Sequence, residues 1–161
     1  MEFKIKNLVT RYKKLLILFI FIILASSSWL IFSDYHQKNT NKNISENYVQ
    51  AGIFLSNKNN EKSKNIYKKI ILSKNKFYSP LALNKILENN LEAKSDEVLK
   101  LFDIIDHIKL PEEQKNLIKI KKALFLIKVA KPEAGNKLLE EIISTNSIWS
   151  NTASEILSNK L

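Results

Sequence analysis

The chain has 161 residues, a formal net charge of +10 and no cysteine. A chain without cysteine cannot form disulfides, use a catalytic thiolate, or bind zinc or iron–sulfur clusters through thiolates. Glycine and proline are scarce, with 2 and 3 copies, which favours long helices over turn-rich sheets. Arg11 is the only arginine. Because planar recognition of phosphate and guanine relies on arginine, we expect no nucleic-acid binding.

The N-terminal segment up to Phe32 has the pattern of a signal anchor. No charged side chain occurs from Leu15 to Phe32, and as a helix this run spans about 27 Å, close to the ~30 Å hydrocarbon core of a bilayer. We therefore predict a basic cytoplasmic tail over residues 1–14 and a transmembrane helix over residues 15–32. The basic residues before the run orient the tail to the cytoplasm and the rest of the chain to the periplasm; they are Lys4, Lys6, Arg11, Lys13 and Lys14.

A cleaved signal peptide is the alternative for this segment. Ala25, Ser26 and Ser27 offer the small residues that a signal peptidase requires. Cleavage there would release a soluble periplasmic helical-repeat protein. The apolar run resumes after these residues, from Trp29 to Phe32, which favours an uncleaved anchor.

The rest of the chain reads as a linker followed by one helical domain. Residues 37–43 are polar and rich in asparagine, so we expect a linker over residues 33–44 and a domain over residues 45–161. Apolar residues then recur at helical spacing without sustained alternation, which predicts an all-α fold of about seven helices and no sheet. The expected helices cover about 45–57, with Ser45 as N-cap, then 60–73, 79–91, 95–108, 111–129 and 131–143, and a last helix from about 148.

The first two expected helices resemble a tetratricopeptide repeat, a hairpin whose two helices approach closely through small residues. A glycine inside a helix costs about 1 kcal/mol relative to alanine, so we expect Gly52 to mark a close helix contact. The matching packing positions of this hairpin are Tyr48, Ala51, Gly52, Leu55, Ser63, Tyr67 and Ile70. Later hairpins keep only fragments of the motif, with no constant 34-residue period, and their expected packing residues are Ala82, Phe102, Leu124, Ala134 and Leu138, with a stripe of Leu117, Ile120, Leu124 and Ile127.

The basic tail, the single span and the YVQAG…EKSKNIYKKI hairpin together resemble a bacterial inner-membrane family of tetratricopeptide-like proteins, described as ancillary subunits of the Sec translocon. The C-terminal stretch with Trp149, Ala153 and Glu155 is similar to a helix of such relatives. The resemblance implies a periplasmic domain that contacts the translocon and exported polypeptides, with no catalytic residue. Trp149 either fills the core or marks an exposed contact with a partner.

The sequence contains no convincing catalytic or metal-binding constellation. Asp103, Asp106 and His107 share one face of an expected helix and could offer two metal ligands, but a solvated helix face is the more ordinary explanation of this cluster. His36 follows the predicted span, where an interfacial position needs no special role. The two glycines lie in no phosphate-loop motif. We therefore expect a protein without enzymatic activity, cofactor or metal.

Two functions fit these features. The first is a membrane-anchored protein–protein interaction module that assists exported polypeptides at the Sec translocon, in a chaperone-like or scaffold role. The second is a structural scaffold of another envelope complex, such as the division or wall-synthesis machinery, in which the same domain holds one folded partner. Crosslinking separates them, since only the first predicts contact with many nascent exported chains.

Overall fold

The computed structural model describes residues 12, 13, 15, 17–19, 21–24 and 40–158. The chain divides into two compact units, Met1–Asn43 and Ile44–Leu161. In the first unit, every described residue between 12 and 24 is helical and exposed. None of the helices formed by described residues is both long and apolar enough to cross a membrane.

Much of the predicted N-terminal organisation lies outside the described residues. This applies to residues 16, 20 and 25–32 of the predicted span, to Lys4, Lys6, Arg11 and Lys14 of the tail, and to residues 33–39 of the expected linker. The transmembrane anchor and its orientation therefore stay predictions from the sequence.

The second unit is all-helical, as predicted. Residues 40–158 form seven helices and no strand, and the first of these helices begins four residues before the unit does. The first covers residues 40–56, and the others are α2 (Asn60–Leu72), α3 (Tyr78–Glu88), α4 (Ser95–Asp106), α5 (Glu112–Lys128), α6 (Pro132–Ile143) and α7 (Ser150–Ser158).

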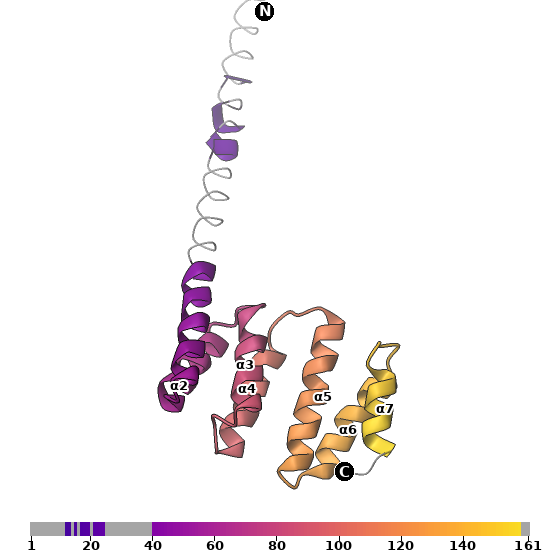
Figure 1. Ribbon diagram of the computed structural model, residues 1–161. Coiled ribbons are helices and arrows are strands. Elements are labelled where there is room, and N and C mark those ends of the chain that lie inside the picture. The colour runs from indigo at the N-terminus through magenta and orange to yellow at the C-terminus, as the bar shows by residue number, and fades with distance from the viewer. Residues whose placement is uncertain (1–11, 14, 16, 20, 25–39, 159–161) are drawn as a thin grey trace, which may run out of the picture. The chain divides into compact units, whose positions relative to one another are not determined.

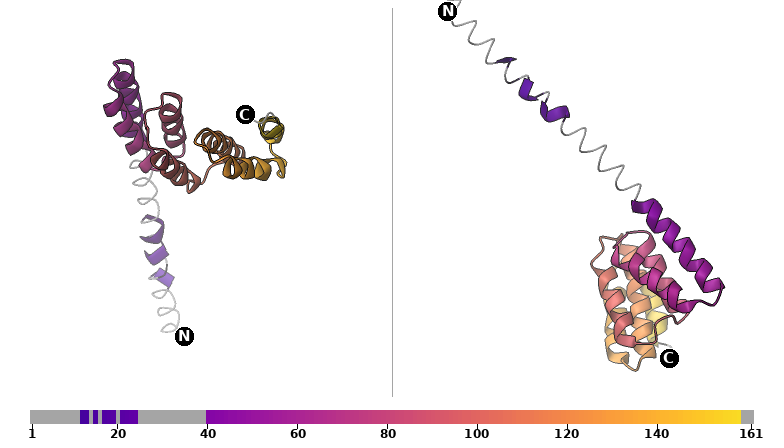
Figure 2. Two further views of the ribbon diagram at one scale, coloured as in Figure 1. Left: turned by 90° about the horizontal axis from the view of Figure 1, so that it is seen from below. Right: turned by 90° about the vertical axis from the view of Figure 1, so that its left-hand side faces the viewer.

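The helices of this unit pack as hairpins that follow one another in chain order (Figures 1 and 2). The 40–56 helix lies beside α2, the α3–α4 pair comes next, and α5 and α6 lead to α7. Among the labelled helices, the most extensive contacts join α5 to α6, α2 to α3 and α6 to α7. α3 and α5 begin 34 residues apart, at Tyr78 and Glu112, while α2, α4 and α6 begin 35 and 37 residues apart, so the hairpins recur at similar but not constant intervals.

Local signals set most helix starts. The Asn59 side chain caps α2 by accepting a hydrogen bond from the Lys62 backbone N–H at 3.3 Å. Acidic side chains lie in the first turns of α4 and α5, where their negative charge interacts favourably with the helix dipole, and α6 begins with a proline. The predicted starts of these four helices lie within one residue of the observed ones.

The predicted start of the first helix is wrong. Ser45 is not its N-cap, because residues 40–44, which were assigned to the linker, are already helical. Ile44 is only 7% exposed and belongs to the hydrophobic core. Burial of this side chain favours helix before Ser45, although the asparagines there are weak helix formers.

Four helices end beside a left-handed residue that is not glycine. Lys58, Lys74, Asn90 and Ala130 have φ values of 59°, 53°, 47° and 59°. After Lys58, Asn90 and Ala130, the next residue donates its N–H to a carbonyl five residues back, as in a Schellman motif. The turn at Asn90 explains why α3 ends at Glu88 and not at the predicted Leu91.

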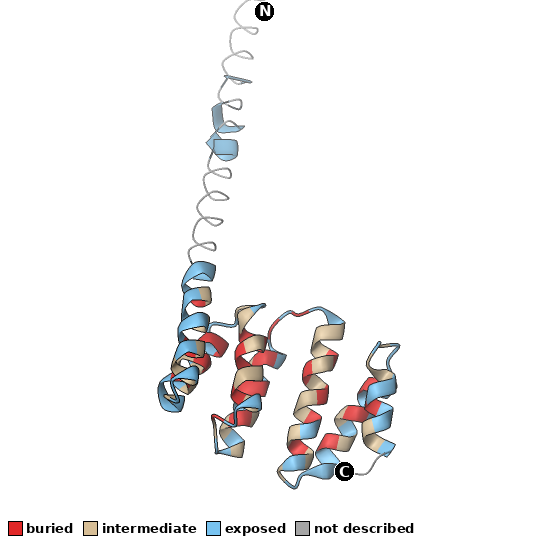
Figure 3. Ribbon diagram, viewed as in Figure 1, coloured by how far each residue is buried: buried red, intermediate tan, exposed pale blue. Residues whose placement is uncertain are grey.

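The buried hydrophobic residues of the unit, among the residues coloured red in Figure 3, form two clusters. The first extends from Ile44 to Ile118 and includes the fully buried Tyr67 and Phe102. The second lies among α5, α6 and α7 and consists of Ile120, Ala123, Leu139, Ile142 and Ala153.

α5 supplies side chains to both clusters, because it packs against α4 on one side and α6 on the other. The single stripe of Leu117, Ile120, Leu124 and Ile127 predicted for this helix is therefore correct only in part: Ile120 is buried and Ile127 packs against the second cluster, whereas Leu124 is exposed. The positions that the structure buries are Asn116, Ile118, Ile120, Ala123 and Leu126.

Candidate functional site

A pocket of about 330 Å³ lies between α3, α5 and the loop that joins α3 to α4. This volume is within the usual range of ligand pockets, near its lower end. Its edge includes exposed residues, so the pocket opens to solvent. The lining residues are Asn84, Ile86, Leu87, Glu88, Asn90, Glu92, Val98, Lys121, Leu124, Phe125 and Lys128.

The floor of the pocket is apolar. Ile86 and Val98 are nearly inaccessible and belong to the first cluster, while Phe125 packs against that cluster with its ring centroid 6.0 Å from that of Phe102. Leu124 is 37% exposed. A ligand side chain that entered would therefore rest on fixed core residues and cover exposed apolar surface.

Two lysine–asparagine hydrogen bonds cross the pocket and join α5 to α3 and to the turn that follows α3. Lys121 Nζ donates to Asn84 Oδ1 at 2.6 Å, and Lys128 Nζ donates to Asn90 Oδ1 at 3.2 Å. Both sequence numbers increase in the same direction, so α3 and α5 run roughly parallel. These two helices are not among the pairs with extensive backbone contact, which leaves room for the pocket between them.

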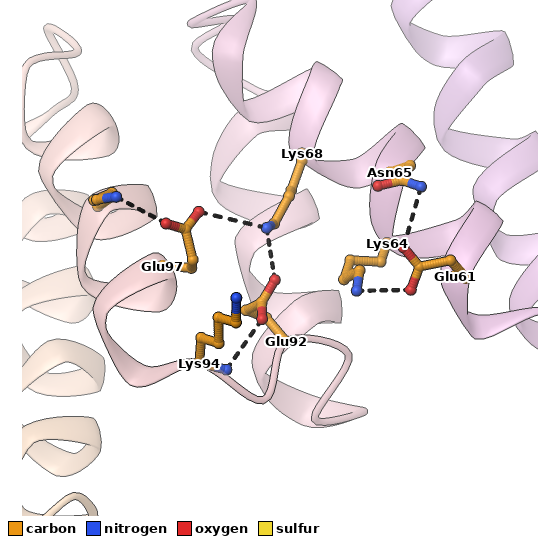
Figure 4. Close-up of polar contacts among 8 residues, drawn as sticks. Glu61, Lys64, Asn65, Lys68, Glu92, Lys94 and Glu97 are labelled. Carbon is orange, nitrogen blue, oxygen red and sulfur yellow. Dashed lines mark hydrogen bonds and ion pairs between the residues drawn. The ribbon is translucent and has the colours of Figure 1, made fainter.

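An ion triad fixes the loop on one side of the pocket (Figure 4). Lys68 Nζ of α2 lies 2.6 Å from Glu92 Oε2 and 3.7 Å from Glu97 Oε2 of α4. The hydrogen bond from Lys68 lowers the pKa of Glu92 below its ordinary value of 4.5, and a second bond, from the Lys94 backbone N–H, lowers it further. The Glu92 side chain is only 8% exposed, whereas Glu97 is 39% exposed, so the pair of Lys68 with Glu92 is less screened by solvent than the pair of Lys68 with Glu97.

We expect Glu92→Gln to lower the free energy of unfolding by about 1–2 kcal/mol at pH 7, because a hydrogen bond to a charged partner is worth more than a neutral one. A carboxylate with a lowered folded pKa stabilises the fold above its unfolded value of 4.5, and this contribution is lost as pH falls through the folded pKa. The difference in unfolding free energy between wild type and variant, measured by urea unfolding, should therefore shrink from pH 7 to pH 3.

As a control, Glu61→Gln should have little effect, since Glu61 pairs with Lys64 on the open surface. If the difference in unfolding free energy between wild type and Glu92→Gln is as large at pH 3 as at pH 7, the stabilising role of the Glu92 carboxylate is contradicted.

The Asp103, Asp106 and His107 cluster is a helix–helix contact in the structure. Lys122 of α5 lies 2.9 Å from Asp103 Oδ1 and 2.8 Å from Asp106 Oδ2. Burial alone would lower the pKa of Lys122, but the hydrogen bonds to Asp106 and Asp103 outweigh it and raise the pKa above 10.5. His107 Nδ1 contacts the Asp103 carbonyl at 2.6 Å. In the part of the chain that the structure describes, no three histidine or acidic side chains are grouped to hold a metal.

Most packing residues proposed for the first hairpin lie at its helix contacts. Ser63 Oγ donates to the Ala51 carbonyl at 2.9 Å, and both residues are fully buried. The Tyr48 ring lies 5.6 Å from the rings of both Tyr67 and Tyr78, which joins the 40–56 helix to α2 and α3. Leu55 packs against the first cluster and Ile70 belongs to it.

Gly52 is not the close helix contact that we expected. A Cβ atom built there would meet only the Tyr67 hydroxyl, at 3.8 Å, which is ordinary van der Waals distance. The tight position is Gly135, where a Cβ atom would lie 2.7 Å from the Ala123 carbonyl oxygen and 2.8 Å from Ile127 Cγ1. Ala51 and Ser63, like Ala123 and Gly135, are twelve residues apart in sequence, so two hairpins repeat the same close approach.

The packing residues proposed for the later hairpins fit only in part. Ala82 and Phe102 are fully buried, and Leu138 packs against the second cluster. Leu124 and Ala134 are exposed, because the close approach uses Ala123 and Gly135, the neighbours of the residues we chose. Residues adjacent in sequence point about 100° apart on a helix, and the packing of α6 on α5 decides that Gly135, and not Ala134, faces the contact.

Trp149 is half-buried and packs against the second cluster. Its indole Nε1 is buried and has no hydrogen-bond partner among the described residues. The neighbouring Ile148 is 73% exposed. The ring therefore contributes to the core around α7.

The pocket itself was not found from the sequence. Its polar rim depends on pairing Asn84 with Lys121 and Asn90 with Lys128, and no local motif marks such distant pairs. A weak indication was the Lys121-x2-Leu124-Phe125-x2-Lys128 spacing, which places two lysines and two apolar residues on one side of a helix.

No protein-family model matches the chain, and neither does any curated protein or solved structure.

Proposed function

We propose that this chain is a membrane-anchored interaction module that binds extended segments of exported polypeptides beside the translocon, without chemical turnover. The observation that carries the proposal is the open pocket between α3 and α5, with its apolar floor and polar rim. Successive hairpins of helical-repeat proteins form concave surfaces, and such surfaces take up peptides through shape and scattered apolar contacts.

The succession of helical hairpins supports a tetratricopeptide-like fold for the domain. The two close approaches, at Ala51 with Ser63 and at Ala123 with Gly135, are what paired helices in such repeats require. In this fold, the parallel helices α3 and α5 are the first helices of two successive hairpins, α3–α4 and α5–α6, and the pocket lies between them.

The membrane and translocon parts of the proposal rest on the sequence. The uncharged run from Leu15 to Phe32 and the basic residues before it support a signal anchor with a periplasmic domain. The resemblance to ancillary translocon subunits supplies the expected partners, which are the Sec translocon and exported polypeptides.

The test is a titration of the full chain, held in zwitterionic lipid nanodiscs, with fluorescently labelled exported proteins in unfolded form. We expect saturable binding of the unfolded proteins and none of the same proteins when folded. The excess of lysine adds attraction for acidic segments, and this part should fade above about 0.15 M salt, where the screening length is ~8 Å.

Duplex and single-stranded DNA serve as the comparison ligands in the same titration. Tight DNA binding with a steep salt dependence and no polypeptide binding would overturn the proposal in favour of a nucleic-acid protein. Binding of a single folded envelope protein at one-to-one stoichiometry, with no binding of unfolded chains, would instead establish the scaffold function.

A further inference from the structure

The five lysines of α5 fall into two groups by their partners. Lys115, Lys119 and Lys122 each lie within 4.0 Å of a carboxylate oxygen, from Glu112, Glu141, and both Asp103 and Asp106, respectively. Lys121 and Lys128 donate instead to asparagine amide oxygens. Within the described part of the chain, neither of these two has a carboxylate at ion-pair distance, so their charges are not neutralised.

Each acidic residue that lines the pocket already forms an ion pair with a lysine outside the pocket lining. Glu92 pairs with Lys68 at 2.6 Å, and Glu88 pairs with Lys85 at 3.1 Å. The amide oxygens of Asn84 and Asn90 carry partial charge only. The pocket rim therefore has two positive charges in excess, at Lys121 and Lys128, beside an apolar floor.

The spacing of these two lysines matches an extended peptide. Seven residues along a helix correspond to about 10 Å, and an extended chain covers about the same distance in three residues. Leu124 and Phe125 stand between the lysines on the same side of α5, and Leu87 and Val98 face them from the other helices of the pocket.

We infer that the pocket selects extended acidic segments in which one apolar side chain lies between two carboxylates about three residues apart. The apolar side chain enters beside Leu124, and the two carboxylates pair with Lys121 and Lys128. The amides of Asn84 and Asn90, released from the lysines, can then bond the peptide backbone. This inference rests on the proposed function and specifies its ligand.

Two features favour a peptide over an anionic amphiphile. The uncompensated charges are two and well separated, whereas a fatty acid carries one headgroup. The pocket is also open along an edge with the exposed Glu88, Asn90 and Lys128, which suits a chain that passes across it.

The test uses the full chain in zwitterionic nanodiscs and labelled twelve-residue peptides. The reference peptide carries two aspartates three residues apart with a leucine between them. Its variants replace both aspartates by asparagine, or the leucine by alanine. We expect the asparagine peptide to bind at least about 10-fold more weakly, because two charge-assisted contacts are lost.

The matched protein variants are Lys121→Gln with Lys128→Gln, and Lys115→Gln with Lys119→Gln on the same helix. The first pair should weaken binding of the aspartate peptide at least about 10-fold and leave the asparagine peptide unchanged. The second pair should change either affinity less than about twofold. Circular dichroism melting of each variant verifies that the fold is retained.

Equal binding of the aspartate and asparagine peptides by the wild type, or full retention of the preference in Lys121→Gln/Lys128→Gln, would overturn the inference. If unfolded exported proteins still bind in that case, the proposed function stands without this selectivity. If no polypeptide binds at all, both fail. Saturable binding of dodecanoate without binding of the aspartate peptide would assign the pocket to an anionic amphiphile.

Discussion

Replacing Phe102 by alanine should lower the free energy of unfolding by about 3–5 kcal/mol, the usual cost of emptying a buried phenylalanine site. Phe102 is fully buried in the first cluster, and its ring contacts that of Phe125 on α5. The substitution therefore removes packing both within the cluster and between α4 and α5. Because a domain of this size is stable by only about 5–15 kcal/mol, this is a large fraction of the total.

Urea unfolding of a fragment spanning residues 40–161, followed by circular dichroism at 222 nm, measures this loss. Phe77→Ala is the matched control, since Phe77 is 63% exposed and should cost little. A loss below about 1 kcal/mol for Phe102→Ala would show that α4 and α5 do not pack through this ring.

Gly135→Leu should destabilise the domain by about 3 kcal/mol, at the upper end of the usual cost of overpacking. The first side-chain atom already collides with the Ala123 carbonyl oxygen and Ile127 Cγ1. A backbone oxygen inside a helix cannot yield without breaking the contact between α5 and α6.

Replacing each glycine by alanine provides a sharper comparison, because the two substitutions should change the free energy of unfolding in opposite directions. Gly52→Ala should stabilise the domain by about 0.5–1 kcal/mol, since it improves helix propensity and meets only ordinary contact distance. Gly135→Ala should destabilise it despite the same gain in propensity. Equal effects in urea unfolding would contradict the placement of the tight helix contact at Gly135.

The helix order of the domain could be predicted because its signals are local. Proline and acidic residues mark the starts of α5 and α6, and apolar spacing distinguishes helix from strand. The aromatic contacts of Tyr48 and Tyr67 followed from the repeat-like motif. The start of the first helix could not be predicted, because burial of Ile44 outweighs the weak helix propensity of the residues before it.

The close contact of α5 with α6 and the pocket between α3 and α5 could be identified only from the three-dimensional structure. Ala134 and Gly135 are adjacent, and only the packing of α6 on α5 decides which faces Ala123. The pocket depends on Asn84 and Lys121, which come from helices that barely touch. Charge patterning along α5 shows five lysines, but only the positions of their partners separate the paired from the unneutralised ones.

Under the proposed function, the pocket between α3 and α5 is where this protein contacts exported polypeptides. Photo-crosslinking in living cells tests it most directly, with a photoreactive amino acid placed at Leu124, or at Leu72 or Ile148 as exposed controls elsewhere on the domain. We predict that Leu124 captures many exported proteins before they fold and that the two control positions capture few. Equal capture at all three positions, or capture of one folded partner alone, would contradict the claim.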